Sequence, residues 1–71
     1  MKPLPFREVK RKLEAAGFAE AGHRGSHVKF AKNTSEGLRT AVVPDYREVA
    51  AGTLRSILRQ AGISAEEWDQ L

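Results

Sequence analysis

The sequence predicts a small α+β domain in which two helices cover one face of a three-stranded antiparallel sheet (α-β-β-β-α), followed by a short extra helix. Two observations lead to this fold. Apolar residues recur at helical spacing near both ends of the chain, and between these segments they alternate with a period of two. A length of 71 residues allows one domain of this kind, so residues 1–71 are expected to fold as a single unit.

An amphipathic helix is expected near each end of the chain, because each segment carries one apolar stripe that can face a sheet. The first helix should span about residues 5–16, with Gly17 at its end. Its stripe consists of Phe6, Val9, Leu13 and Ala16. The second helix should span about residues 52–61, with Gly62 at its end. Its stripe consists of Leu54, Ile57, Leu58 and Ala61.

Three short strands joined by glycine-containing turns are expected between the helices, over residues 18–23, 27–31 and 38–43. In the second strand, Val28 and Phe30 share one face, whereas His27 and Lys29 share the other. The apolar face should pack against the helices. His27 and Lys29 should therefore face solvent.

Two further segments complete the chain. Residues 45–51 connect the last strand to the second helix, and their pattern predicts no regular element. Ser64 and Glu67 have the spacing of a capping box, which predicts a short third helix carrying Trp68.

The charge of the chain is unevenly divided. Residues 1–32 hold eight Lys and Arg against three Glu, a net of +5, and residues 33–71 hold four Arg against six acids, a net of −2. A basic half of this kind favours a polyanionic partner, nucleic acid first, or an acidic protein. The alternative is a solvated, charged helix face without a specific partner.

Several chemistries are excluded or disfavoured by what the sequence lacks. Cysteine is absent, so disulfides, thiolate metal sites and thiol nucleophiles are excluded, and a reducing compartment, the cytoplasm, is expected. No apolar run approaches the roughly 20 residues of a membrane span. No glycine-rich phosphate loop is present, and neither His23 nor His27 begins a zinc-binding spacing, so we expect neither a cofactor nor a metal.

His27 is the strongest candidate for chemistry. It opens the second strand on the solvent side, next to Lys29 and just after Arg24, where positive charge would attract a phosphate. Taken alone, this pattern is most often that of an exposed histidine without a role.

Four motifs give the chain a family resemblance. They are Gly17-Phe18, then Arg24-Gly25-Ser26-His27 followed by Phe30, then Val42-Val43-Pro44, and then the block from Gly52-Thr53-Leu54 through Arg59-Gln60-Ala61-Gly62-Ile63. Together, from the first helix through Ile63, they resemble the HicA (YcfA-like) family of toxins, small bacterial or archaeal mRNA interferases. The resemblance implies a fold like that of the double-stranded-RNA-binding domain. It also implies that His27 is catalytic and that a HicB-type antitoxin is the partner.

The chain departs from the family pattern at one place. Many relatives carry a second histidine shortly after the Val-Pro, where this chain has Asp45-Tyr46. If that histidine assists catalysis in relatives, Tyr46 has to replace it or the role is lost.

These observations predict the toxin of a toxin–antitoxin system, a metal-independent endoribonuclease that cleaves mRNA with His27 as general acid and base. The residues expected to contact RNA are Arg24, Gly25, Ser26, Lys29, Lys32, Lys10 and Arg11. Two alternatives stay open: a non-catalytic RNA-binding module of the same fold, and an interaction domain whose basic face serves an acidic protein.

Overall fold

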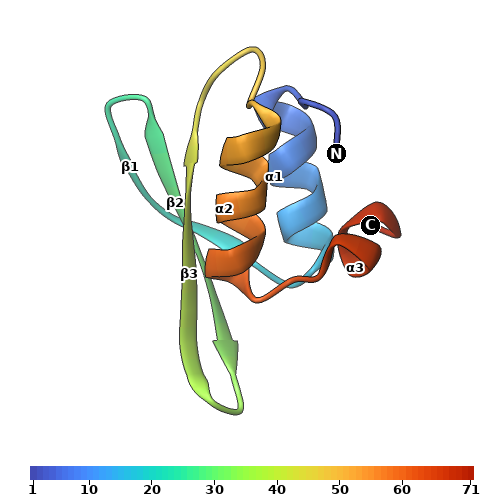
Figure 1. The fold of residues 1–71 in the computed structure, drawn as a ribbon. Helices are drawn as coiled ribbons and strands as arrows, with labels where there is room; N and C mark the ends of the chain where they lie inside the picture. The colour runs from blue at the N-terminus through green and yellow to red at the C-terminus, as the bar shows by residue number, and fades with distance from the viewer.

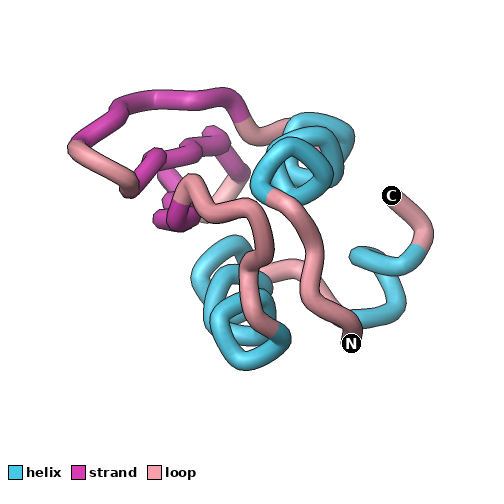
Figure 2. Tube along the Cα trace, turned by 90° about the horizontal axis from the view of Figure 1, so that it is seen from above, coloured by secondary structure: helices cyan, strands magenta, loops and turns pink.

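The computed structural model describes all 71 residues and has the predicted element order (Figure 1). The elements are α1 (Phe6–Ala15), β1 (Ala19–Arg24), β2 (His27–Thr34), β3 (Gly37–Pro44), α2 (Ala51–Ala61) and α3 (Ala65–Asp69). Both long helices lie on the same side of the sheet, and α3 lies beyond them on the side away from it (Figure 2). The predicted α+β class and helix placement are therefore confirmed. No helix combines the length and the apolar character that crossing a membrane would require.

The sheet is an antiparallel meander in the order β1-β2-β3. Gly25, in the first turn, and Gly37, the first residue of β3 after the second turn, both adopt positive φ, of 59° and 112°, a conformation that side-chain-bearing residues rarely adopt. The register pairs His27 with Arg24 on one side and with Pro44 on the other. An irregularity between Glu20 and Gly22 bends β1.

The alternation predicted for β2 extends across the sheet and gives it two different faces. Val28 and Phe30 of β2 are buried against the helices, as are Ala41 and Val43 of β3. The opposite face has no helix or loop over it (Figure 2), and His27, Lys29 and Val42, which alternate with the buried residues, are exposed there.

A single hydrophobic core fills the space between sheet and helices. It contains 13 buried residues, drawn from all three helices, from β2 and β3, and from the connections. α1 contributes Val9 and Leu13, which is half of its predicted stripe, whereas Phe6 and Ala16 are partly buried at the edge of the core. Full burial of each large apolar side chain stabilises the fold by roughly 1.5–3 kcal/mol.

The ends of α2 and α3 follow the predicted signals. Gly62 ends α2 in the left-handed region at φ 71°, a conformation that favours glycine, and a Cβ there would also displace the Arg39 guanidinium, 2.8 Å away. The capping box of α3 is formed in full. The Ser64 hydroxyl accepts a hydrogen bond from the Glu67 backbone N–H, and the Glu67 carboxylate accepts one from the Ser64 backbone N–H. Trp68 is thereby held in the core.

The segment between β3 and α2 contains a contact that the sequence pattern did not predict. Leu4, before α1, forms an isolated antiparallel bridge with Val49, with backbone hydrogen bonds of 3.1 and 2.6 Å. Val49 is fully buried as a result. The bridge joins residues that are far apart in the chain, so local periodicity carries no signal for it.

Candidate active site

His27 lies at the start of the central strand, on the face of the sheet that the helices leave bare. Its cross-strand partners are Arg24 on β1 and Pro44 on β3. Directly opposed residues project to the same side of a sheet, so the Arg24 side chain is a neighbour of the imidazole. His27 is exposed and takes part in neither of the ion pairs of the chain. The solvent-facing position predicted from alternation is therefore confirmed.

The imidazole borders a shallow hollow of about 280 Å³. The residues that line it are Gly22, His23, Arg24, His27, Lys29 and Val42. Gly22 is paired with Lys29 and has no side chain, which leaves room beside the lysine. The structure thus brings together His27, Arg24 and Lys29.

The Gly25-Ser26 turn fixes the position of His27 at one end of the hollow. It is a two-residue hairpin loop with positive φ at its first residue. The Ser26 carbonyl accepts a 2.6 Å hydrogen bond from the Asp45 N–H, which ties the turn to the end of β3. Gly25 and Ser26 themselves are exposed, so the turn is accessible to a ligand at His27.

The charge around the hollow is entirely positive. Arg24 and Lys29 are both exposed, and no carboxylate lines the hollow. The two ion pairs of the chain, Lys10 with Glu20 and Arg11 with Glu8, leave Arg24 and Lys29 unpaired. The hollow is therefore suited to an anion, with an imidazole positioned beside it.

Lys10 and Arg11 lie on α1, away from this face, and each is already engaged. The Lys10 Nζ is 3.4 Å from Glu20 Oε1, and Arg11 bonds both to the Glu8 carboxylate and to the Leu71 carbonyl. The hydrogen bond from Arg11 lowers the pKa of the Glu8 carboxyl and raises the pKa of the guanidinium.

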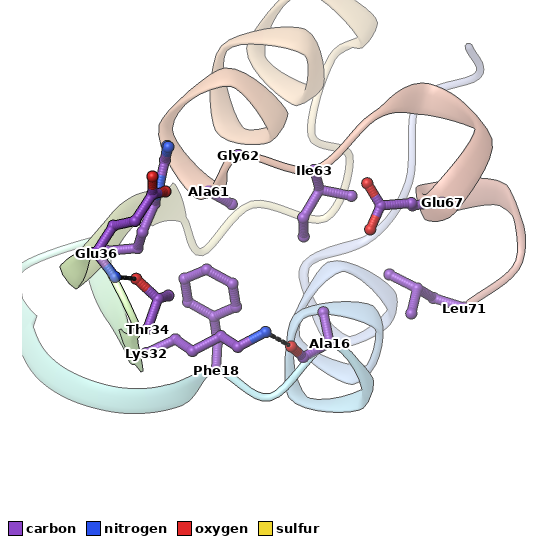
Figure 3. Close-up of a pocket in the computed structure, with 11 residues that line it drawn as sticks. Ala16, Phe18, Lys32, Thr34, Glu36, Ala61, Gly62, Ile63, Glu67 and Leu71 are labelled. Carbon is purple, nitrogen blue, oxygen red and sulfur yellow. Dashed lines mark hydrogen bonds between the residues drawn. The ribbon is translucent and has the colours of Figure 1, made fainter.

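Lys32 lies on the helix-covered side of the sheet, three residues along β2 from Lys29. Its Nζ donates a 2.7 Å hydrogen bond to the Ala16 carbonyl at the end of α1 and lies 5.8 Å from the centre of the Phe18 ring. Figure 3 shows this lysine at the edge of a second hollow, which Glu36 and Glu67 also line. The structure therefore groups only some of the expected RNA contacts around His27, namely Arg24, Gly25, Ser26 and Lys29. The other three lie away from this face; they are Lys32, Lys10 and Arg11.

Besides Gly22, two residues of the hollow carried no functional prediction. His23 lines it although it pairs with Val28, and Val42 is 42% exposed. The signal for Val42 was available, because it alternates with the buried Ala41 and Val43. His23 lies beside the irregularity of β1, where simple alternation does not hold. No group of three or more potential metal-ligating side chains converges anywhere in the structure.

A small sheet with a positively charged, histidine-bearing open face is compatible with a domain that binds or cleaves a nucleic acid. Comparison with known proteins identifies the family. The model of a family described as the HicA toxin of bacterial toxin–antitoxin systems matches residues 6–63, which include every element except α3. The chain belongs to this HicA toxin family, as its motifs predicted. No curated protein matches the chain at a significant level.

Proposed function

We propose that this protein is an endoribonuclease that cleaves mRNA, with His27 as its catalytic residue. One observation supports this above others. In this toxin of a toxin–antitoxin system, an exposed imidazole shares one hollow on a bare sheet face with two unpaired cations. A toxin has to act on a cellular target, and a cationic hollow that contains an imidazole base suits a phosphodiester.

RNA reduces what the protein has to supply, because it carries its own nucleophile. His27 takes the proton of the 2′-OH, the 2′ oxygen attacks the adjacent phosphorus, and the bond from phosphorus to the 5′ oxygen breaks. That oxygen takes up a proton from water as it leaves, and the imidazolium of His27 then returns its proton to solvent. The products end in a 2′,3′-cyclic phosphate and a 5′-OH. A positioned base of this kind contributes typically about 10²–10⁴-fold to the rate.

The cations beside His27 would stabilise the negative charge that develops on the phosphate oxygens. Arg24 lies opposite His27 on β1, and Lys29 lies two residues further along β2. The Ser26 hydroxyl and the backbone N–H groups of the turn are further donors. Contacts to phosphate position a strand but carry no sequence information. The proposed RNA contacts are Arg24, Gly25, Ser26 and Lys29, which predicts little sequence preference.

The reaction needs no metal ion in this scheme, since the 2′-OH replaces a metal-bound hydroxide. A toxin that cleaves mRNA would act in the cytoplasm, and its partner would be a HicB-type antitoxin. Both belong to the same proposal.

The test compares RNA cleavage by the wild type with that of His27→Ala. The variant should lose at least about 100-fold in cleavage rate and retain its thermal unfolding midpoint, because the side chain is exposed on the bare face. His23→Ala is the comparison and should retain cleavage within about tenfold of the wild type. Unfolding of His27→Ala would instead make His27 a structural residue.

Two conditions separate the chemistry from its alternatives. Cleavage should continue in excess EDTA and should stop when hydrogen replaces the 2′-OH at the scissile nucleotide. Equal cleavage of DNA, or a requirement for metal, would contradict the mechanism. If wild-type protein binds RNA with a strong salt dependence but never cleaves it, the function is that of a non-catalytic RNA-binding module.

A further inference from the structure

An exposed aromatic residue stands directly beyond β3, at the same end of the sheet as His27. Tyr46 is the only tyrosine of the chain and is 51% exposed. Its phenol forms no hydrogen bond within the chain, so neither the core nor a polar contact accounts for the ring.

The backbone of Tyr46 is held firmly even though the ring is exposed. Its N–H donates to the Pro44 carbonyl at 2.9 Å, and its carbonyl accepts from the Phe6 N–H at 3.1 Å. The Asp45 N–H, one residue earlier, donates to Ser26 at 2.6 Å. The backbone of Tyr46 is therefore already ordered before any ligand binds. Stacking on this ring would cost little of the entropy that is usually lost when a loop is fixed.

The ring borders an open hollow of about 600 Å³. The residues that line it are Pro5, Phe6, Arg7, Asp45, Tyr46 and Arg47. The charged groups facing the ring are thus two guanidinium groups and one carboxylate. Neither arginine takes part in an ion pair, and both are exposed. An aromatic face with free arginines beside it is the combination by which proteins hold single-stranded nucleic acids.

Hydrogen bonds and register place this hollow next to the His27 site. The residue before Tyr46 is bonded to the residue before His27, and Pro44 is the cross-strand partner of His27. The Cα atoms of Tyr46 and His27 are at most about 13 Å apart, given about 3.8 Å between consecutive Cα atoms and about 5 Å between paired strands. A strand whose phosphate lies at His27 can therefore place a neighbouring nucleotide at Tyr46.

We propose that Tyr46 is a stacking subsite for a base of single-stranded RNA next to the phosphate that is cleaved, with Arg7 and Arg47 contacting the backbone of that nucleotide. This inference rests on the proposed endoribonuclease function. Stacking accepts any base, since every base has an aromatic face, so the subsite selects for an unpaired nucleotide rather than for a sequence. A base inside a duplex is already stacked on its neighbours, and single-stranded RNA is accordingly the preferred substrate.

The first test is kinetic. Tyr46→Ala should raise KM for a single-stranded RNA about 5- to 150-fold, the loss that a stacked base typically causes, and change kcat much less. Tyr46→Phe keeps the aromatic face and should retain most of the affinity. The control is Leu38→Ala, which removes another exposed apolar side chain, 64% exposed, at the opposite end of β3. It should leave KM unchanged.

Three kinetic results would overturn the subsite. If Tyr46→Ala cleaves as the wild type does while His27→Ala is inactive, the proposed function holds and the stacking fails. If Tyr46→Phe loses kcat as severely as Tyr46→Ala, the phenol takes part in the chemistry and the ring is not a platform. If Tyr46→Ala cleaves normally but escapes inhibition by the antitoxin, the ring belongs to a protein interface.

The second test observes the ring directly and does not depend on cleavage. Because the chain has one tyrosine, its ring protons form a single set of NMR resonances. Adding single-stranded RNA to His27→Ala protein should move them upfield, and an abasic nucleotide next to the scissile position should abolish the shift. Unmoved ring resonances, with those of Lys29 shifting, would reject the stacking alone. Absence of any RNA binding would reject both the stacking and the proposed function.

Discussion

Each side chain of the central strand faces either the helices or the bare side of the sheet, according to its place in the alternation. Lys29 and Lys32 illustrate this, because both lie in β2 and are three residues apart. Lys29 is exposed beside His27, whereas the Lys32 amine is bonded to the Ala16 carbonyl beneath the sheet. Two identical side chains therefore have different environments, and we expect them to have different functions.

The two lysines provide a matched test of where RNA binds. Lys29→Gln should weaken binding of single-stranded RNA and reduce the slope of log affinity against log salt by about 0.7, the value for one lost phosphate contact. Lys32→Gln should leave both quantities unchanged and instead lower the free energy of unfolding, because Ala16 loses its hydrogen-bond partner. Filter-binding titrations at several salt concentrations between about 50 mM and 200 mM measure the affinity for RNA and its salt dependence for both variants. An equal loss of RNA affinity in the two variants would show that RNA does not bind along the open face of the sheet that carries Lys29.

The sequence predicts the centre of the site because that centre depends on local geometry. Alternation alone places His27 and Lys29 on one face, and the glycine turn brings Arg24 opposite His27. The directions of Lys10 and Arg11 depend instead on how α1 is rotated against the sheet and on the positions of Glu20 and Leu71. That rotation is a tertiary property, and a count of basic residues does not contain it.

At the scale of elements, the predicted ranges fit best where apolar periodicity defines them. α1 is one residue shorter than predicted at each end, and α2 begins one residue earlier than predicted and ends where predicted. The capping box predicts the start of α3. β2 was predicted to end at Ala31, yet it continues to Thr34. Residues 32–34 are polar and lack a hydrophobic pattern, but pairing with β3 satisfies their backbone groups. The bridge between Leu4 and Val49 likewise needs two distant segments to meet.

The capping box gives a prediction at this scale. Ser64→Ala removes the side chain that accepts from the Glu67 N–H and should reduce the free energy of unfolding by about 1 kcal/mol. Urea unfolding followed by the fluorescence of Trp68, the single tryptophan, measures the change. Ser35→Ala is the control, because Ser35 is exposed in the turn between β2 and β3 and should change stability by less than about 0.5 kcal/mol. Equal midpoints for the two variants would mean that the cap does not stabilise the fold.

At the scale of the whole molecule, the helices and the open sheet face have separate roles. The helices bury the core and leave one sheet face, together with the edge formed by β1, available to partners. The other edge is partly occupied, since the Gln60 side chain of α2 accepts a 3.0 Å hydrogen bond from the Val42 N–H. A protein that blocks the site can therefore approach the open face and pair a strand with β1.

The cognate antitoxin is expected to act by covering this open face. A domain of 71 residues with one continuous core has little room to transmit a change from its helical side, so direct occlusion of His27 is the simplest inhibition. Acidic groups of the antitoxin would meet Arg24 and Lys29, which would exclude the phosphate backbone and make association faster at low salt. In the complex, His27 should lose reactivity toward an acylating reagent and Lys29 toward acetylation, as measured by mass spectrometry. Lys2, exposed before α1, should keep its reactivity and serve as the control. An inactive complex in which His27 and Lys29 react as they do in the free toxin would show that the antitoxin binds the helical side and acts by distortion.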